Sequence, residues 1–342
     1  YSPHFHAYQD STFKGVTIKH IYSPEQWMGS AVGSFFYDYS SLKDALKNED
    51  FDIVYDCGYT SIVPAYIRFS VHKLLSPVII TNMDGLEYKR TKFNSLVRKF
   101  IFWEEKMAVK YSHFLVSDNK GISSYYSEKY GKTSTFLAYG AHIYSDYSEK
   151  YLERYKLSSG KYLLVVARME PENNIETIIR GYLYSGISDQ PLILVGKTNT
   201  PFAKKLIKRY GSKKGVRFVG GIYDFKELNS IRYYSAGYFH GHSVGGTNPS
   251  LLEAMASSCF IIAHDNPFNK SVMGENATYF SNASDISAAV KNSVFNNESL
   301  REQYRTNNLA IIEKDYSWQK IIAGHESFFK EILDTHIQKE RI

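Results

Sequence analysis

The sequence predicts an α/β chain of two domains, each with a parallel sheet covered by helices. Its 342 residues exceed what one ordinary hydrophobic core holds. Short apolar runs alternate with helical patterns, which is typical of right-handed βαβ crossovers. A polar stretch near residues 145–158 interrupts the alternation, which then restarts. Two such series predict two Rossmann-like domains.

The first series predicts an N-terminal Rossmann-like domain over residues 1–150. Its strand candidates are GVTIKHI (15–21), FDIVYDC (51–57), PVIITN (77–82), FLVSD (114–118) and TFLAYG (135–140). The helical patterns include SLKDALKN (41–48) and the long NSLVRKFIFWEEKMAVKYS (94–112). The chain opens on YSPHFHAYQDSTFKG, which is neither a first strand nor the glycine-rich turn with which such domains normally start. We therefore expect a natural piece before Tyr1 that carries this turn.

The second series predicts a C-terminal Rossmann-like domain over residues 151–325. Its strand candidates are YLLVVAR (162–168), PLILVG (191–196), VRFVGG (216–221), GYFHG (237–241), FIIAHD (260–265) and ATYF (277–280). Helical patterns separate them, such as NIETIIRGYLYSG (174–186) and FKELNSIRYYS (225–235). Residues 326–342 are expected to form a C-terminal helix, for which packing back on the N-terminal domain is one option.

Composition and charge narrow the functional class. The net charge of +6 suits an anionic small ligand or a membrane surface and is weak support for nucleic acid, which we do not expect as a partner. No apolar run has the length of a transmembrane helix. We expect a cytoplasmic protein, and peripheral contact with the inner face of the cell membrane stays open.

The cysteines and histidines do not predict a metal site. Cys57 and Cys259 are far apart and lack metal-ligand spacing, so the default is a reducing compartment without disulfides or zinc. The His-x-His pairs at 4–6 and 240–242 have no third ligand in reach. We therefore expect no metal.

Two common nucleotide motifs are excluded. Gly196-Lys197-Thr198 follows a strand candidate and resembles the end of a P-loop, but Pro191 stands where that motif needs a glycine. No G-x-G-x-x-G follows a strand candidate, so a nicotinamide or flavin enzyme has little support.

The stretch HGHSVGGTNPSLLEAMASS (240–258) predicts an anion site. Asn248 is a good N-cap and Pro249 a favoured first helical residue, so a helix starts directly after Gly245-Gly246-Thr247. A helix N-terminus behind a glycine-rich turn presents free N–H groups that suit a diphosphate. Glu253, one turn further on, can accept hydrogen bonds from a vicinal diol such as a ribose. The alternative is a capped helix with a solvated glutamate.

Arg168 stands at the expected carboxyl end of a strand, where ligands bind in open α/β sheets. Its planar guanidinium suits a diphosphate. The alternative is an ion pair between Arg168 and Glu170 or Glu172.

At these motifs the sequence resembles a known family. ARMEPENN (167–174) and VGGTNPSLLEAMAS (244–257) are similar to the GR(L)xxEKN and E-G-x-G-x-P-x-L-E-A-M-A motifs of retaining family 4 glycosyltransferases with the GT-B fold. This resemblance spans about 160 to 320 and includes YSWQKIIAGHESFFKEIL. In the N-terminal half, residues 81–141, which begin TNMDGLEYKR and end TFLAYGA, resemble a bacterial rhamnosyltransferase-like subgroup whose members start with VDGLEWKR.

The resemblance implies a GT-B fold, in which two Rossmann-like domains face each other across a cleft. It implies transfer, with retention of configuration, of a sugar such as rhamnose or another deoxyhexose in surface polysaccharide synthesis. The donor would be a dTDP-, UDP- or GDP-sugar, and the acceptor a saccharide or a polyprenyl-diphosphate-linked saccharide. No metal or other cofactor is implied. Two alternatives stay open, which are a GT-B nucleotide-sugar epimerase and an inactive nucleotide-sugar-binding protein.

The resemblance also assigns donor-binding residues. Asn173 stands where the family has a diphosphate-binding lysine, so Arg168, the 246–248 amides or Lys197 must supply the missing charge. Gly245 stands where the family has a glutamate that touches the donor sugar, and His242 or backbone N–H groups are the candidate substitutes. The donor-binding residues are Arg168, Asn173, Lys197, Ile222 (whose backbone would read the base), His242, Gly246, Thr247, Asn248 and Glu253.

The acceptor is expected on the N-terminal domain. Asp84 follows a strand candidate and is assigned, with Arg168, to catalysis, as a group that binds the acceptor hydroxyl or takes its proton. Its alternative role is that of a turn residue before Gly85. Glu87, Lys89 and Arg90 are the further acceptor-binding candidates.

The segment 85–110 carries seven Lys/Arg and three Glu, with Phe100, Phe102 and Trp103 interleaved. This pattern suits either an anionic membrane surface or a solvated helix with a packed aromatic face.

Overall fold

The sheet of the C-terminal domain has six parallel strands in the order β11-β10-β9-β12-β13-β14. Their bounds in chain order are β9 Leu163–Val166, β10 Leu192–Val195, β11 Val216–Gly220, β12 Gly237–His240, β13 Ile261–His264 and β14 Thr278–Phe280. The first strand is central and the order reverses between β9 and β12, as in a doubly wound sheet. The six strand candidates of this half are thereby confirmed.

Apolar side chains cover both faces of this sheet. Along β9, Leu164 packs into one buried cluster, whereas Leu163 and Val165 pack into another. A parallel sheet covered on both faces needs such continuous apolar strands. Helices and short helical turns provide the cover: α6 Lys150–Glu153, η3 Pro171–Asn173, α7 Ile175–Ser185, α8 Pro201–Tyr210, α9 Phe225–Tyr233, α10 Pro249–Ala256, α11 Pro267–Met273, α12 Ala283–Lys291 and η4 Val294–Asn296.

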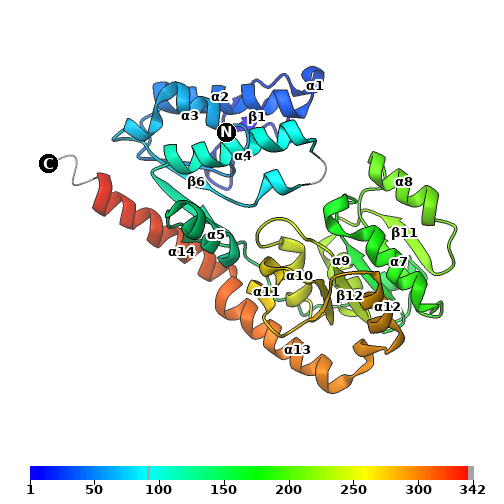
Figure 1. Cartoon of the computed structure of the whole chain (residues 1–342). Coiled ribbons are helices and arrows are strands. Elements are labelled where there is room, and N and C mark those ends of the chain that lie inside the picture. The colour runs from blue at the N-terminus through cyan, green and yellow to red at the C-terminus, as the bar shows by residue number, and fades with distance from the viewer. Residues whose placement is uncertain (91–92, 338–342) are drawn as a thin grey trace.

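The N-terminal domain contains a second parallel sheet, in the order β5-β6-β7-β8. These strands are β5 Ile53–Asp56, β6 Val78–Asn82, β7 Phe114–Ser117 and β8 Thr135–Phe136. Its helical elements are α1 Glu25–Met28, α2 Ser30–Asn48, α3 Val63–Phe69, η1 Val71–Lys73, η2 Glu87–Lys89, α4 Ser95–Tyr111 and α5 Lys120–Tyr130. This computed structural model describes residues 1–90 and 93–337, and Figure 1 shows its two α/β domains.

The prediction of one strand over residues 15–21 was wrong. The structure instead has the antiparallel pair β2 Thr12–Phe13 and β3 Val16–Thr17, and the parallel pair β1 Ser2–Pro3 and β4 His20–Ile21. Lys14 and Gly15 have φ of +49° and +84° and reverse the chain between β2 and β3. Two successive positive φ angles are typical of a tight hairpin turn.

Side-chain caps explain where many helices begin. A side-chain oxygen of the residue before the helix accepts a hydrogen bond from a backbone N–H of the first turn, which satisfies a donor that the helix itself cannot. The capping residues are Asn94, Asn119, Thr200, Asp224, Asn248, Asn266, Asn282 and Asn297.

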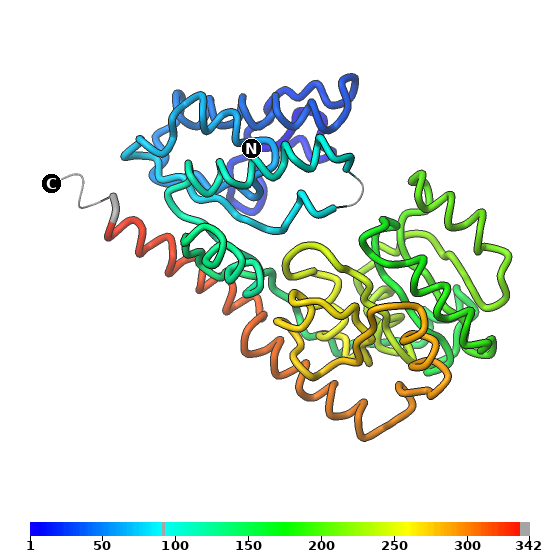
Figure 2. The backbone as a smooth tube through the Cα atoms, in the orientation of Figure 1, coloured from blue at the N-terminus to red at the C-terminus, as the bar shows by residue number. Residues whose placement is uncertain are grey.

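The C-terminal helices return to the N-terminal domain. They are α13 Glu298–Ile311, the π-helical η5 Ile312–Tyr316, α14 Trp318–Ile332 and η6 Leu333–Ile337. Phe328 and Ile332 of α14 pack into the same cluster as Val78, Ile80 and Val116 of the N-terminal sheet. The orange-to-red tube in Figure 2 follows this path from one domain to the other. Residues 338–342 of the predicted C-terminal helix lie outside the described residues.

Candidate active site

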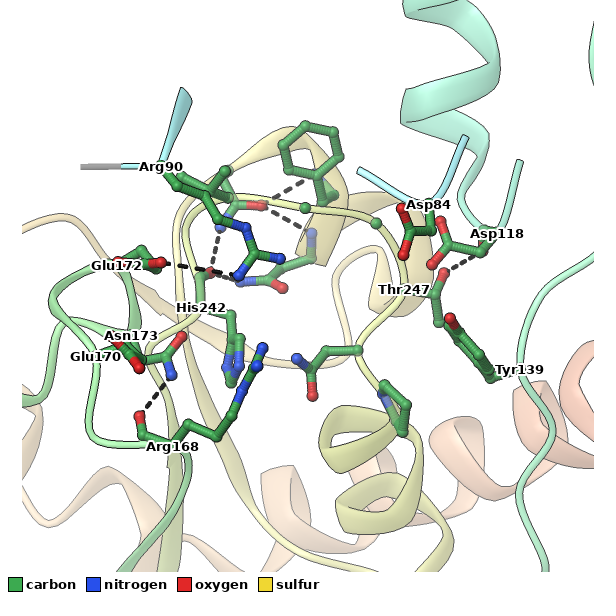
Figure 3. A pocket seen from close by; sticks show the side chains of 18 residues that line it. Asp84, Arg90, Asp118, Tyr139, Arg168, Glu170, Glu172, Asn173, His242 and Thr247 are labelled. Carbon is green, nitrogen blue, oxygen red and sulfur yellow. Dashed lines mark hydrogen bonds and ion pairs between the residues drawn. The ribbon is translucent and has the colours of Figure 1, made fainter. Parts of the chain in front are cut away.

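A cavity of about 150 Å³ lies between the domains, at the carboxyl ends of both sheets (Figure 3). Residues that follow strands of both sheets line it: Asp84 after β6, Asp118 after β7, Tyr139 after β8, Arg168 after β9, His242 after β12 and Asn266 after β13. Ligands of open α/β sheets bind at this edge, so the cavity is the candidate active site.

The loop before α10 forms one wall of the cavity. The Asn248 side chain accepts a hydrogen bond from the Ser250 N–H at 2.9 Å, and Pro249 is the first helical residue. Gly245 has a φ of +116°, which strains any other residue. Within residues 1–90 and 93–337, the backbone N–H groups of Gly246 and Asn248 have no hydrogen-bond acceptor, whereas the N–H of Thr247 interacts with the Asp118 carboxylate. The two free N–H groups line the cavity at the positive end of a helix, where an anion such as a diphosphate can bind.

Arg168 is exposed beside this loop, and its guanidinium makes no ion pair with any described residue. Neither Glu170 nor Glu172 pairs with it, so the alternative role of a structural ion pair is not the arrangement found. The Asn173 side chain donates to the Arg168 carbonyl oxygen at 2.7 Å and thereby holds the backbone that carries Arg168. A free guanidinium beside free amide groups is suited to a diphosphate.

Arg90 brings a second positive charge to the cavity from the N-terminal domain. Its guanidinium lies 2.6 Å from a carboxylate oxygen of Glu87 and 3.8 Å from one of Glu172, which belongs to the C-terminal domain. Burial, followed by the charges of Arg168 and Arg90, lowers the pKa of His242 to about 3. His242 is therefore neutral at pH 7 and can donate or accept a hydrogen bond without carrying charge.

Two carboxyl groups face these cations across the cavity (Figure 3). Burial, with a smaller contribution from Glu87, raises the pKa of Asp84 to about 6, although Arg90 opposes the shift. Burial, followed by the charge of Asp84, raises the pKa of Asp118 to about 8. At pH 7 Asp84 is thus mostly ionised and Asp118 mostly protonated, so one group can accept a proton while the other can donate a hydrogen bond.

The sequence analysis missed Asp118. The signal that identified Asp84, an aspartate directly after a strand candidate, is also present in FLVSD. Only the structure shows that both aspartates meet at one cavity, because their strands are neighbours in the sheet.

Asp118 also marks the contact between the domains. A Cβ atom on Gly246 would lie 1.8 Å from Oδ1 of Asp118, so only glycine fits while the domains are in this position. The Thr247 hydroxyl donates to the Asp118 carbonyl oxygen at 2.5 Å, and the Asn119 side chain donates to the Thr247 hydroxyl at 3.2 Å. The loop that offers its amides to an anion is therefore held by the N-terminal domain.

We expect Asp118→Asn to stabilise the protein at alkaline pH. The folded state holds the Asp118 proton more tightly than the unfolded state, so this group lowers stability as pH rises from about 4 to about 8. The variant should exceed the wild type in free energy of unfolding by about 2 kcal/mol at pH 8.5 and match it at pH 4. Urea unfolding at both values measures this difference, with the exposed Asp146→Asn as the control. An equal difference at the two pH values would contradict the prediction.

Glu253 lies one turn into α10 and faces an adjoining cavity of about 260 Å³. This second cavity shares Tyr139 and Pro249 with the first, so one ligand can extend through both. The Glu253 side chain is 39% exposed and accepts a hydrogen bond at 2.5 Å from the buried guanidinium of Arg232. The sequence analysis missed Arg232, because an arginine within a helical pattern is usually a surface residue.

Four further candidates lie outside the lining of the first cavity. Lys197 is exposed, and the Ile222 side chain lies in the core, so only the Ile222 backbone is left for ligand binding. Glu87 forms an ion pair with Arg90, and the Lys89 ammonium lies 5.8 Å from the centre of the Tyr125 ring.

Among the described residues, no group of three His, Cys, Asp or Glu side chains is placed to hold a metal ion.

Three aromatic residues of the segment 85–110 lie at the surface. Phe100, Phe102 and Trp103 of α4 are 42%, 39% and 40% exposed. Phe35 of α2 contacts the Phe100 ring at a centroid distance of 6.0 Å, so the aromatic surface extends over two helices. Lys92 lies outside the described residues. For residues 1–90 and 93–337, no helix is both long enough and apolar enough to cross a bilayer.

Two family descriptions match the chain. Residues 149–310 match "Glycosyl transferases group 1", and residues 5–142 match "Domain of unknown function (DUF1972)". No curated protein matches the sequence. The first match makes the chain an enzyme that transfers sugars, as the sequence analysis predicted.

Several solved structures have the same fold. A sucrose-phosphate synthase from Thermosynechococcus elongatus has a TM-score of 0.73 at 12% identity, over 92% of this chain and 81% of its own. A glycosyltransferase from Rickettsia africae has a TM-score of 0.67 at 14% identity, over 93% of this chain and 86% of its own. The Anabaena protein HepE, in complex with UDP-glucose, has a TM-score of 0.69 at 12% identity, over 87% of this chain and 82% of its own. These likenesses confirm the predicted fold, which is GT-B.

Proposed function

From the premise that this chain is a glycosyltransferase with the GT-B fold, we propose that it moves a sugar from a nucleotide diphosphate donor to a saccharide hydroxyl, with retention of configuration. One observation carries this proposal. A single cavity joins groups suited to a diphosphate, which are Arg168 and the Gly246 and Asn248 amides, to the carboxyl groups of Asp84 and Asp118 on the other domain.

The reaction breaks the bond between the anomeric carbon of the sugar and the β-phosphate oxygen, and forms a bond from that carbon to the acceptor oxygen. The leaving diphosphate keeps the electron pair of the broken bond. Arg168 and the free amides stabilise its developing negative charge. The acceptor proton passes to the Asp84 carboxylate or to the leaving diphosphate, and both routes balance the charge. Contact between the domains holds the two sugars in position for the transfer.

The nucleoside of the donor extends from the first cavity into the second. Glu253 lies one helical turn beyond the anion-binding loop and accepts hydrogen bonds from the ribose. The structure of HepE contains UDP-glucose, and a nucleotide of that kind is the donor class proposed here.

The sugar and the acceptor are inferred from the motifs. The resemblance of residues 81–141 to rhamnosyltransferase-like sequences supports rhamnose or another deoxyhexose as the transferred sugar. Gly245, where related sequences have a glutamate, supports a sugar that is recognised in a different way. A polyprenyl-diphosphate-linked saccharide is the proposed acceptor, in the synthesis of a surface polysaccharide.

Product analysis tests the proposed function. Purified protein is incubated with UDP-, dTDP- and GDP-sugars and a synthetic polyprenyl-diphosphate disaccharide, and the products are identified by mass spectrometry and NMR. The proposal expects a longer saccharide with a retained anomeric configuration. An isomerised nucleotide sugar without transfer would instead indicate an epimerase. Tight nucleotide binding without any product would indicate an inactive binding protein.

We also propose that α4 docks on an anionic membrane, where a lipid-linked acceptor is located. The exposed Phe100 and Trp103 accompany Lys99, Lys106 and Lys110 on this helix, and aromatic and cationic side chains together favour anionic lipid surfaces. Replacing Phe100 and Trp103 by serine is expected to lower binding to phosphatidylglycerol vesicles at least tenfold in cosedimentation. The control is Tyr223→Ser, which removes a 77% exposed aromatic residue of the other domain. Equal binding by both variants would contradict membrane docking through α4.

A further inference from the structure

Arg232 of α9 is a fully buried arginine directly beside the carboxylate assigned to the ribose. Its side chain is 2% exposed, and its Nη2 donates to Oε2 of Glu253 at 2.5 Å. Its Nη1 donates to Oδ1 of Asn229 at 3.0 Å. Within the described part of the chain, its Nε has no hydrogen-bond partner. The guanidinium is thus desolvated, incompletely hydrogen-bonded and paired with one partly exposed carboxylate.

Stability does not explain this arrangement. Taking a guanidinium out of water is costly, and an apolar side chain of similar volume is often equally stable or more stable at such a position. The surroundings offer an apolar alternative, because the neighbouring Ile231, Leu252 and Met255 all belong to the core of the domain. A costly charge beneath a ligand-binding side chain indicates a role in the site.

The contacts of Arg232 fix one side of the Glu253 carboxylate. Asn229 is itself held, because its Oδ1 also accepts a hydrogen bond from the Ser257 hydroxyl at 3.2 Å. Ser257, Asn229, Arg232 and Glu253 therefore form a chain of hydrogen bonds that ends at the second cavity. Without it, a glutamate side chain that is 39% exposed would rotate among several rotamers.

We propose that Arg232 is a positioning residue, which orients Glu253 to bind both hydroxyls of a ribose and thereby makes the site select ribonucleoside diphosphates over their 2′-deoxy forms. This inference rests on the proposed function, which assigns the ribose to Glu253. A carboxylate with a fixed orientation can accept from two neighbouring hydroxyls at once, whereas a mobile one loses this advantage to entropy. A site built to bind a hydroxyl discriminates strongly against a ligand without it.

The experiment compares nucleotides that differ only in the 2′-hydroxyl. Isothermal titration of the full chain with UDP and dUDP, with 5-methyluridine diphosphate and dTDP, and with GDP and dGDP, first identifies the base that binds. For that base we expect the ribonucleotide to bind at least about tenfold more tightly than the deoxynucleotide. Arg232→Met should weaken ribonucleotide binding about tenfold and bring the ratio of the two affinities close to one.

Three further variants separate positioning from general destabilisation. Glu253→Gln should also bring the ratio close to one, and combining it with Arg232→Met should add no further loss, because both act on one contact. Arg301→Met is the matched control. Arg301 also lies in the C-terminal domain, where it donates to the Ala236 and Ser235 carbonyl oxygens at 2.9 Å. Its loss should lower the melting temperature and leave the affinity ratio unchanged.

The outcomes distinguish this inference from the proposed function. Tight nucleotide binding by the wild type without preference for the ribonucleotide overturns the role of Arg232, and so does a folded Arg232→Met variant with an unchanged ratio. If Arg232→Met does not fold, an unchanged ratio in Glu253→Gln overturns the inference in its place. Binding of none of the nucleotides by the wild type contradicts the proposed function itself.

Discussion

Replacing Arg168 by alanine is expected to lower kcat about 10³-fold and to leave the free energy of unfolding within about 0.5 kcal/mol of the wild type. The guanidinium is exposed and makes no ion pair with any described residue, so the folded protein loses no stabilising contact. The transition state loses the cation that faces the leaving diphosphate. Steady-state kinetics and urea unfolding measure the two quantities.

The control is Arg180→Ala, which removes an exposed arginine of α7 whose hydrogen bond is to Tyr184, away from the cavity. Arg168→Lys should fall between the wild type and Arg168→Ala, because lysine keeps the charge but lacks the planar pair of donors. A loss in Arg168→Ala smaller than tenfold would remove Arg168 from catalysis.

The second large effect is expected from Gly246→Ala. The new Cβ would lie 1.8 Å from the Asp118 carboxylate, so the donor loop and the N-terminal domain cannot keep their contact. Because closure brings the two halves of the site together, we expect kcat/KM to fall about 10²- to 10³-fold. The melting temperature should change little, since the loop lies in the contact between the domains and contributes no side chain to the hydrophobic cores of either domain.

Removing the obstacle tests this explanation. In Asp118→Gly the Cβ of an added Gly246→Ala no longer meets a carboxylate, so adding Gly246→Ala to Asp118→Gly should lower kcat/KM less than about tenfold further, with Asp118→Gly alone as the reference for the lost carboxyl group. Gly58→Ala is the control, because a Cβ there meets no atom within 4 Å. A loss on adding Gly246→Ala to Asp118→Gly as large as the loss in the wild type would show that the glycine serves the loop backbone and not the domain contact.

Local patterns predicted the C-terminal half well. Its six strands and the helix start at Asn248 and Pro249 follow from apolar runs and capping chemistry, which depend on neighbours in sequence. Arg168 and Asp84 were found because residues that follow parallel strands meet at one edge of a sheet. For Arg168 the prediction needed only local patterns and the general rule for where parallel strands end, whereas the assignment of Asp84 to the site also rested on the family resemblance.

What the sequence could not predict depends on packing between distant segments. Whether Asp118 faces the cavity is decided by the approach of the donor loop of the other domain. Arg232 resembles a surface residue of a helix, and only the neighbouring α10 makes it a buried partner of Glu253. Lys197 follows a strand as Arg168 does, yet it does not line the cavity.

The return of the C-terminal helix has a consequence for motion between the domains. The chain crosses from the N-terminal to the C-terminal domain near Ala141 and returns near Ser317. These two residues form an isolated parallel β-bridge. Gly140 lies so close to Trp318 that a Cβ there would be 2.5 Å from the indole ring. Because the two segments that connect the domains lie side by side, we expect any rotation of one domain against the other to pivot about them. Residues 140–142 and Trp318 also line the second cavity, so a rotation about them would reshape the cavity that is proposed to hold the nucleoside.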